Sequence, residues 1–265
     1  MSQLFVYSDN AIESAWFKSL HPSFQNLESR TIQGRGNNPS VIENLIQYDR
    51  PDIILTDGSR ALLVIEKTRE VPTGHNVGQR VARLVKAAEN RIPVIKFFPF
   101  DAKKHGRYSS ICHLNIRLLL AFERIWDIHD CPIVALNWVA DEDGELIDDG
   151  SEDDEIKSVL NDFVNSRFDP KCSRFSDIRN QSDQEYKDRL ARRSQYGDPP
   201  PSVTFNSTSS YLENLGFSIE PNVKSHLLQN QESVVYRIGM TEKNCKRQDP
   251  YTGTQFIYDY AHCRS

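Results

Sequence analysis

Two carboxylates that flank one short hairpin are the residues of this chain best suited to chemistry. Asp52 follows Pro51 at the start of an apolar run, and Glu66 follows a second apolar run, fourteen positions later. A strand, a turn at Asp57-Gly58 and a second strand would fold this interval back on itself and bring the two acids together. Mg²⁺ prefers carboxylate oxygens, and once bound it acidifies water and neutralises phosphate. The pair therefore predicts a divalent-metal site for cutting a phosphodiester.

Glu66 ends a strand that is expected to be buried on both faces, so its charge needs a partner. Two explanations stay open: a metal ion, or an ion pair with Arg80 or Arg83. Alternate residues of a strand share a face, so Glu70 should project with Glu66 and is a further candidate ligand. By the same rule, the adjacent Lys67 should face the other way.

The hairpin, residues 50–70, must be held by a sheet and its helices. The sequence Ser40-Val-Ile-Glu43 has the spacing of a capping box and predicts a helix to about residue 48, before Pro51. A basic helix is predicted at 76–90, with its apolar side turned inward. Other helices are predicted at 10–20 and 111–128, and strands at 4–7, 52–56, 61–68, 92–98 and 131–139. Together these elements predict an α/β (α+β) fold with a mixed central β-sheet flanked by helices.

The segment from Pro51-Asp52 to Glu66-Lys67-Thr68 resembles the motif of the PD-(D/E)xK nuclease superfamily, which includes the type II restriction endonucleases. The resemblance implies a restriction-endonuclease-like core in αβββαβ order, with additions at the C-terminal side. It implies that Asp52 and Glu66 hold Mg²⁺, with Mn²⁺ as a substitute. An acid on the preceding helix sometimes completes such a metal shell, and Glu43 has the matching place.

The helix after the second acidic strand often turns glutamine or basic residues toward the phosphates in such nucleases. Gln79 fits a catalytic role of this kind, and Arg80, Arg83 and Lys86 fit DNA contacts. Lys67 is the candidate for the catalytic lysine of the motif.

The chain departs from the motif at two places. Thr68 occupies the position of the family's lysine, and only three residues separate the Ser40 helix from Asp52, which leaves no room for a first strand there. A β-bulge that re-aims Lys67, a cation such as Lys86 reaching in, a second metal on Glu70, or loss of the chemistry would each account for Thr68.

The charge of the chain is unevenly distributed. The net charge is −5, but residues 141–155 hold ten carboxylates and no cation, and the remainder is net basic. A basic patch on such a chain is compatible with DNA binding. Five scattered cysteines indicate reduced thiols in a cytoplasm, and apolar runs are too short for a membrane span.

The acidic run is the predicted boundary between two parts. Residues 1–140 would be the nuclease-like core, 141–155 an acidic linker, and 156–265 a C-terminal region for DNA contact or dimerisation. In this region helices are predicted at 154–166 and 183–196 and strands at 233–238 and 255–260, with Lys246 and Arg247 as DNA contacts.

The expected function is a Mg²⁺-dependent endonuclease that hydrolyses double-stranded DNA, of the restriction or another defence kind. Cutting both strands favours a homodimer with two symmetric sites. The alternative is a non-catalytic nucleic-acid-binding or assembly module with a nuclease-like fold, for which Thr68 is the main support.

Overall fold

The computed structural model describes residues 3–72, 75–103, 111–192, 202–210 and 232–237. The chain divides into two compact units, of which the first contains β1 to α6 and the second contains β9 and β10.

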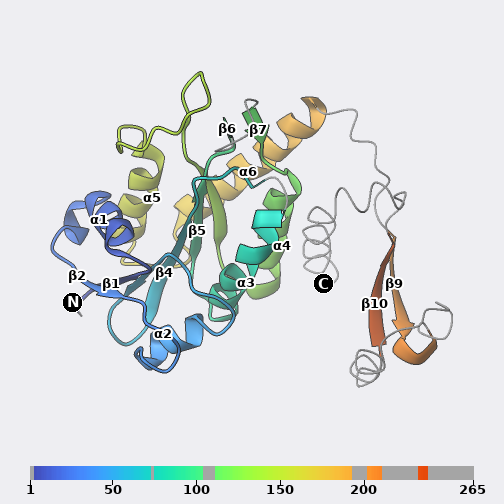
Figure 1. Cartoon of the computed structure of the whole chain (residues 1–265), viewed down its shortest axis with the longest axis horizontal. Helices are drawn as coiled ribbons and strands as arrows, with labels where there is room; N and C mark the ends of the chain where they lie inside the picture. Colours follow the sequence, from blue (N-terminus) through green and yellow to red (C-terminus); the bar gives the residue numbers. More distant parts are fainter. Residues whose placement is uncertain (1–2, 73–74, 104–110, 193–201, 211–231, 238–265) are drawn as a thin grey trace. The chain divides into compact units, whose positions relative to one another are not determined.

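A mixed six-stranded sheet in the order β2-β1-β3-β4-β5-β8 forms the centre of the first unit (Figure 1). β1 is parallel to β2 and antiparallel to β3, β3 is antiparallel to β4, and β4, β5 and β8 are parallel. The strands are β1 (Phe5–Ser8), β2 (Glu28–Thr31), β3 (Ile53–Thr56), β4 (Ala61–Lys67), β5 (Val94–Phe98) and β8 (Ile133–Asn137). The predicted mixed central sheet is confirmed.

The inner strands are apolar on both faces because helices cover both sides. All four residues of β3 and all five of β5 are buried, as are six of the seven residues of β4. Such continuous apolar runs are typical of strands enclosed between two helical layers. β2, whose sequence is ESRT, is exposed throughout and forms one edge.

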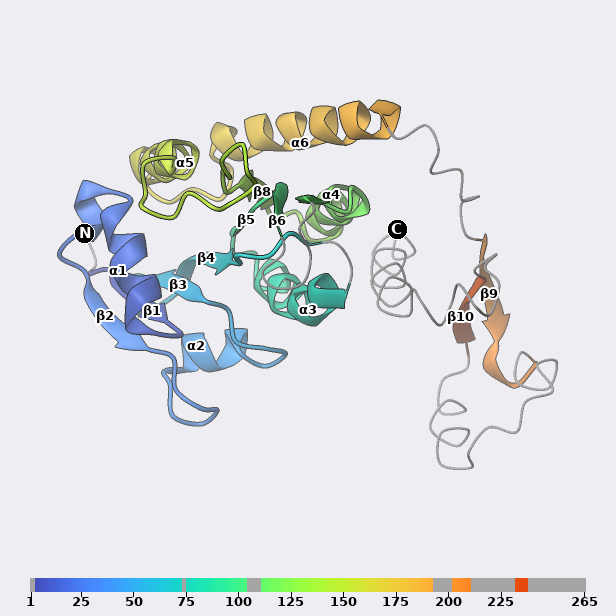
Figure 2. The ribbon, with the colours of Figure 1, turned by 45° about the horizontal axis from the view of Figure 1, so that its top comes forward.

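In the described residues, six α-helices flank the sheet in two layers. Figure 2 shows α5 and α6 on one side of the sheet and α2 and α3 on the other. One core cluster combines side chains of α2, α3 and α4 with one face of the sheet, and a second combines α1, α5 and α6 with the opposite face. The helices are α1 (Ala11–Ser19), α2 (Ser40–Leu45), α3 (His75–Glu89), α4 (Arg117–His129), α5 (Asp154–Asn165) and α6 (Ser173–Arg192), with a short 3-10 helix at Pro22–Phe24. No helix in the described ranges is both long enough and apolar enough to cross a membrane.

Several element boundaries differ from those predicted. The interval expected to start a helix at residue 111 begins instead as β7 (Ile111–His113), which pairs with β6 (Asp101–Lys103). α6 begins ten residues before the predicted position, and its early turns bury Phe175 and Ile178. The sequence leaves no room for a strand between the Ser40 helix and Asp52, and the partner of β3 is β1, which precedes that helix in the chain.

The capping box predicted at Ser40 does not form. Pro39 is the N-cap of α2 and makes no side-chain hydrogen bond, and the helix ends at Leu45. The Glu43 carboxylate instead accepts hydrogen bonds from the backbone N–H groups of Gly36 and Asn38 in the preceding loop.

The acidic segment is not the boundary between the two units. Trp16 Nε1 donates a hydrogen bond to Asp153, which is buried, and Asp148 pairs with Arg69. Beyond it, α5 packs against the sheet through Phe163, which contacts Phe175 of α6. Because α5 and α6 complete the core of the sheet, the first unit extends past residue 155 to the end of α6.

The described part of the second unit is a two-stranded antiparallel sheet. β9 (Ser202–Ser207) pairs with β10 (Glu232–Arg237), with Val234 opposite Phe205. β10 matches the strand predicted at 233–238, whereas the strand predicted at 255–260 lies outside the described residues.

Candidate functional site

Three charged side chains form a row across neighbouring strands on the face of the sheet that α3 covers. In the β3–β4 hairpin Ile53 is paired with Ile65, so Asp52 and Glu66 are the next residues on the two strands. In the parallel pair of β4 and β5, Glu66 lies opposite Lys96. The alternation of side chains in a strand places all three on the same face.

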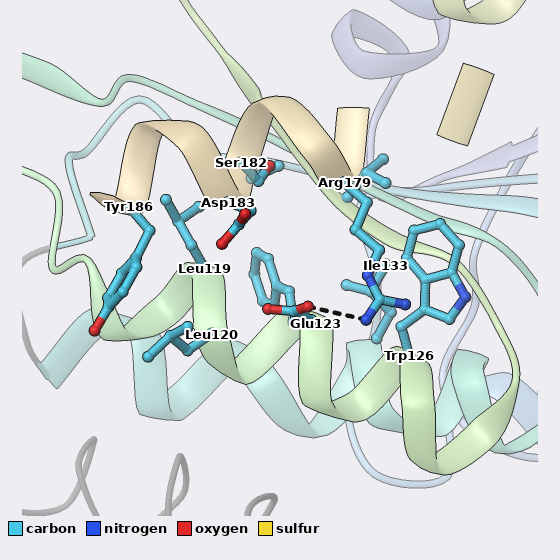
Figure 3. A pocket seen from close by; sticks show the side chains of 12 residues that line it. Leu119, Leu120, Glu123, Trp126, Ile133, Arg179, Ser182, Asp183 and Tyr186 are labelled. Atoms are coloured by element: carbon cyan, nitrogen blue, oxygen red, sulfur yellow. Dashed lines mark hydrogen bonds and ion pairs between the residues drawn. The ribbon is translucent and has the colours of Figure 1, made fainter. Parts of the chain in front are cut away.

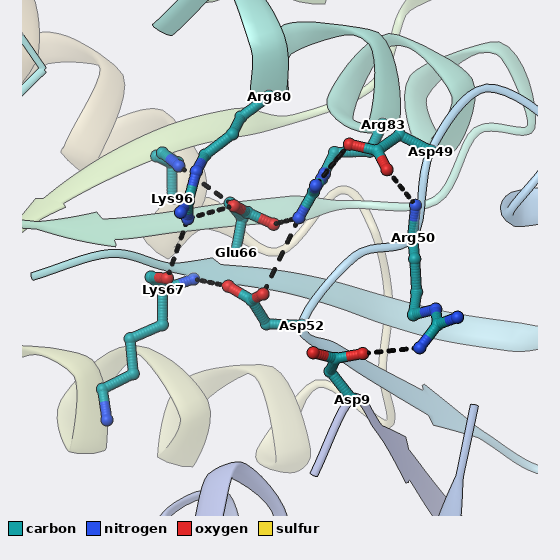
Figure 4. Close-up of polar contacts among 9 residues, drawn as sticks. All are labelled: Asp9, Asp49, Arg50, Asp52, Glu66, Lys67, Arg80, Arg83 and Lys96. Carbon is teal, nitrogen blue, oxygen red and sulfur yellow. Dashed lines mark hydrogen bonds and ion pairs between the residues drawn. The ribbon is translucent and has the colours of Figure 1, made fainter. Parts of the chain in front are cut away.

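Glu66 is completely buried and is held by three cations (Figure 4). Its Oε1 accepts from Arg80 Nη1 at 2.9 Å and lies 3.4 Å from Lys96 Nζ, and its Oε2 accepts from Arg83 Nη1 at 2.9 Å. A buried carboxylate needs compensating charges and hydrogen bonds, and these three cations supply them. The ion pair expected with Arg80 or Arg83 is therefore present, with both arginines.

Asp52 is the less well compensated of the two acids. Its Oδ2 accepts from the backbone N–H of Lys67 at 2.7 Å, and its Oδ1 is 3.7 Å from Arg83 Nη1. Burial, followed by the charge of Glu66, raises the pKa of Asp52 to about 7. The carboxyl group therefore titrates near neutral pH in the absence of a further cation.

Lys96 is a buried base at the other end of the row. It interrupts the apolar sequence of β5, and its side chain is almost fully enclosed. Burial lowers the pKa of Lys96 to about 8, against the opposing effect of Glu66. An amine with such a pKa can exchange a proton close to neutral pH.

α3 presents the two arginines from above the row. Val81, Leu84 and Ala88 of this helix are buried in the core, so Arg80 and Arg83 point from its edge toward the strands. Arg83 is held at both ends, because its Nε donates to Asp49 Oδ2 at 2.7 Å while its Nη1 donates to Glu66.

Arg80 is more exposed than Arg83 and is held by fewer groups. Its Nη1 donates a hydrogen bond to Glu66 Oε1 and lies 3.4 Å from the carbonyl oxygen of Lys67. Of the Arg80 side chain, 37% is exposed. Arg80 therefore contacts one oxygen of the acid pair and one backbone oxygen next to it.

The other predicted residues of α3 have different positions. Lys86 Nζ lies 3.5 Å from Glu89 and 5.0 Å from the ring centroid of Tyr48, so its described contacts are with neighbours outside the acid pair. The backbone of Gln79 belongs to α3, and its side chain lies outside the described part of the structure.

Lys67, the predicted catalytic lysine, lies on the opposite face of β4. Its Nζ is 3.6 Å from Glu13 Oε2 and stacks over the rings of Trp16 and Trp138, at 4.2 and 4.6 Å from their centroids. β4 is regular here, so no bulge re-aims the side chain. The amine that lies beside Glu66 is that of Lys96. The amine of Lys67 packs on the opposite side of the sheet, against Trp16 and Trp138.

Two further acids were predicted as metal ligands. The contacts described for the Glu43 carboxylate are with the loop at 36–38, and Asn38 Nδ2 adds a third hydrogen bond at 2.7 Å. The structure therefore does not bring Glu43 to the pair. Glu70, with Thr68, lines a small cavity of about 10 Å³ that Arg80 and Lys96 also line, so it lies beside the site.

The donor set fits a cation that needs few protein ligands. No group of three or more His, Cys, Asp and Glu side chains in the described residues is arranged to hold a metal ion. Mg²⁺ commonly uses one or two carboxylates and completes its shell with water and substrate oxygens. Asp52 and Glu66 supply two adjacent carboxylates, and burial together with the charge of Glu66 raises the pKa of Asp52.

A wide cavity of about 510 Å³ opens beside Asp52, and Arg80 and Arg83 also line it. By contrast, the cavity between α4 and α6 in Figure 3 measures about 20 Å³, which is the space of a single water. Arg179 closes it through ion pairs with Glu123 and Asp127, both at 2.9 Å. Of these two cavities, only the one at Asp52 has room for a substrate.

Two residues of the cluster were not predicted. Lys96 carries the same signal as Glu66, a single charge inside an apolar strand, and that signal was available in the sequence Val94–Phe98. Asp49 is placed by the turn after α2, and no local pattern distinguishes it from a surface acid. The predicted DNA contacts Lys246 and Arg247 lie outside the described residues.

Comparisons with known proteins do not add to this description. No protein-family model, no curated protein and no solved structure matches the chain.

Proposed function

We propose that this protein is a Mg²⁺-dependent endonuclease that hydrolyses phosphodiester bonds of double-stranded DNA, of the restriction or another defence kind. The observation that carries the proposal is the row of Asp52, Glu66 and Lys96 on one face of the sheet, beside an open cavity with two arginines. Two acids can hold a divalent metal ion and a base of lowered pKa can exchange a proton, and both groups can serve the hydrolysis of a phosphodiester.

Asp52 and Glu66 would hold the metal, and Mn²⁺ would substitute for it. When bound, Mg²⁺ supplies a more acidic water and neutralises charge on the phosphate. For the metal to reach Glu66, Arg80 must leave Oε1, and its exposed side chain has the freedom to do so. Arg83 stays in place, because Asp49 holds its Nε.

The other residues of the cluster have distinct roles in this proposal. Arg80, once released, contacts the phosphate, and Arg83 steadies Glu66 and Asp52. Lys96, with a pKa near 8, would as the neutral amine take the proton that the attacking water gives up. Gln79 would contact the phosphate, as expected from the sequence. The proposed partners are duplex DNA and a second copy of the chain, and the proposed location is the cytoplasm.

A second candidate function is a nucleic-acid-binding module without catalysis. One observation favours it: both oxygens of Glu66 already have partners in Arg80, Arg83 and Lys96. The charge of Glu66 is therefore compensated without a metal ion. In this case the arginines would bind phosphate and the acids would only position them.

Incubation with supercoiled plasmid DNA separates the two functions. The endonuclease is expected to nick or linearise the plasmid with Mg²⁺ or Mn²⁺ and to leave it intact in EDTA. Asp52→Asn is expected to abolish cutting, whereas Asp162→Asn, on the outer side of α5, is the matched control that keeps it. Retarded but uncut plasmid under both metals would favour the binding module.

A further inference from the structure

The cavity beside Asp52 continues away from the acid pair and is lined there by residues to which no role has yet been given. Gln33 and Arg35 come from the loop after β2, and Tyr48 and Arg50 from the turn after α2. In Figure 4, Asp49 and Arg50 lie on one side of Asp52 and Lys96 lies on the other. The cavity therefore extends the site in one direction, toward the loop and the turn.

The charges on this side of the cavity favour an anion. Arg35 and Arg50 join Arg80 and Arg83, so four guanidinium groups line one space. The three acids that also line it are engaged: Asp9 pairs with Arg50 at 2.8 Å, Asp49 pairs with Arg83, and Asp52 accepts from Lys67.

The two outer arginines retain most of their hydrogen-bonding capacity. In the described part of the chain, Arg35 donates through Nη2 to the carbonyl of Gln47, and Arg50 donates through Nη1 to Asp9. A guanidinium carries five N–H groups in a planar fork that matches a phosphate. Both side chains are exposed, so these groups can reach a ligand that enters from solvent.

We infer that Arg35 and Arg50 bind the phosphate backbone of the DNA strand next to the phosphate that is cut. The inference rests on the proposed function, since Asp52 and Glu66 mark the position of the cut. Arg35 and Arg50 are positioning residues, because they hold the strand and do not touch the reacting atoms. An extended polyanion fits an open cavity of about 510 Å³ better than a single phosphate does.

Binding of a short fluorescein-labelled DNA duplex to the full chain, measured by anisotropy in EDTA over a range of KCl, tests this role without cleavage. Arg35→Gln and Arg50→Gln are each expected to weaken binding and to lower the salt slope by about 0.9, the value for one lost phosphate contact. Arg60→Gln is the matched control, because Arg60 also pairs with a nearby aspartate but lies beyond β3, at the other end of the hairpin. It is expected to keep the slope of the unmodified chain.

Unchanged slopes in Arg35→Gln and Arg50→Gln, an equal loss in Arg60→Gln, or no binding at low salt would each overturn the role. Equal melting temperatures establish that the variants are folded. If binding depends on both arginines but no plasmid is cut, the proposed endonuclease activity is contradicted and the phosphate contacts are not. If the plasmid is cut but binding does not depend on Arg35 and Arg50, the phosphate contacts are contradicted and the endonuclease activity is not.

Discussion

At the scale of single residues, Glu66 is the centre of the cluster, because three cations converge on one buried carboxylate. Removing one partner of a buried pair typically costs about 3–5 kcal/mol, because the remaining charge stays buried. Variants that keep the shape of the side chain are therefore the informative ones, and a shortened side chain at this position would confuse folding with chemistry.

Lys96 and Lys67 form a matched pair, because their side chains lie on opposite faces of the sheet at neighbouring positions of β5 and β4. Lys96→Met removes the amine beside Glu66 and is expected to slow plasmid cutting by about 10²–10⁴-fold, the usual effect of losing a general acid or base. Lys67→Met removes a cation from Trp16 and Trp138 and is expected to cost about 0.5–2 kcal/mol of stability with cutting retained. Full cutting by Lys96→Met would contradict the assignment of the base.

The pKa of Asp52 predicts how stability changes with pH in the absence of metal. The folded pKa of about 7 is above the ordinary value, so the folded state holds this proton more tightly than the unfolded state. The contribution is complete below the ordinary pKa of about 4 and is lost as the pH rises through about 7. Asp52→Asn cannot ionise and should escape this loss.

Thermal melts in EDTA measure this effect. Near pH 8, Asp52→Asn is expected to be more stable than the unmodified chain by at least about 1 kcal/mol, or about 2–4 °C in Tm. Near pH 4 the difference should shrink, because both chains are then neutral at this position. A difference in Tm that does not vary with pH would argue against a raised pKa at Asp52.

At the scale of elements, the register of three strands builds the site. The pairing of Ile53 with Ile65 and of Glu66 with Lys96 brings residues from two hairpin strands and a crossover strand into one row. The hairpin could be predicted from its apolar runs and its Asp57-Gly58 turn. The neighbour of β4 could not, because strand order depends on long-range packing and not on local pattern.

The same contrast explains which site residues were found. Asp52 and Glu66 follow from local spacing, and the alternation rule correctly predicted that Lys67 faces away from Glu66. Asp49 and Lys96 reach Glu66 or its arginines only after α3 and β5 pack on the hairpin. β1 was unexpected as the partner of β3 because the chain returns to it after forming α1, β2 and α2.

The packing of α5 and α6 makes a prediction about stability. Phe163 of α5 is fully buried and contacts Phe168 and Phe175. Phe163→Ala is expected to cost about 3–5 kcal/mol, because it leaves a cavity in the core of the sheet. Urea unfolding followed by Trp fluorescence, with Trp16 and Trp138 near this core, should show one transition at lower urea. A second, unshifted transition would indicate that residues 1–140 fold apart from α5 and α6.

At the scale of the whole molecule, an acidic chain places four of its arginines around one cavity, the one at which we propose that phosphate binds. The net charge is −5, and the segment at 141–155 supplies ten of the carboxylates. Arg35, Arg50, Arg80 and Arg83 nevertheless line one cavity. The proposed contacts with DNA therefore depend on the local charge of this cavity and not on the net charge of the chain.

Metal binding to the acid pair should stabilise the whole fold. At a Mg²⁺ concentration about 100 times its Kd, mass action adds about 2.7 kcal/mol to the free energy of unfolding. The Tm of the unmodified chain at neutral pH is expected to rise with Mg²⁺, and that of Asp52→Asn is not. An equal rise in both would assign the stabilisation to other acids, such as those at 141–155.

The rate at which Glu66→Gln cuts plasmid DNA in a single turnover with saturating Mg²⁺ tests the central claim most directly. Glutamine keeps the shape of the side chain and still accepts hydrogen bonds from an arginine, but it removes the charge that would hold the metal. The account predicts that this folded variant loses cutting by at least about 10²-fold, a loss in the range of a missing catalytic group. A folded Glu66→Gln chain that cuts at the rate of the unmodified protein would contradict it.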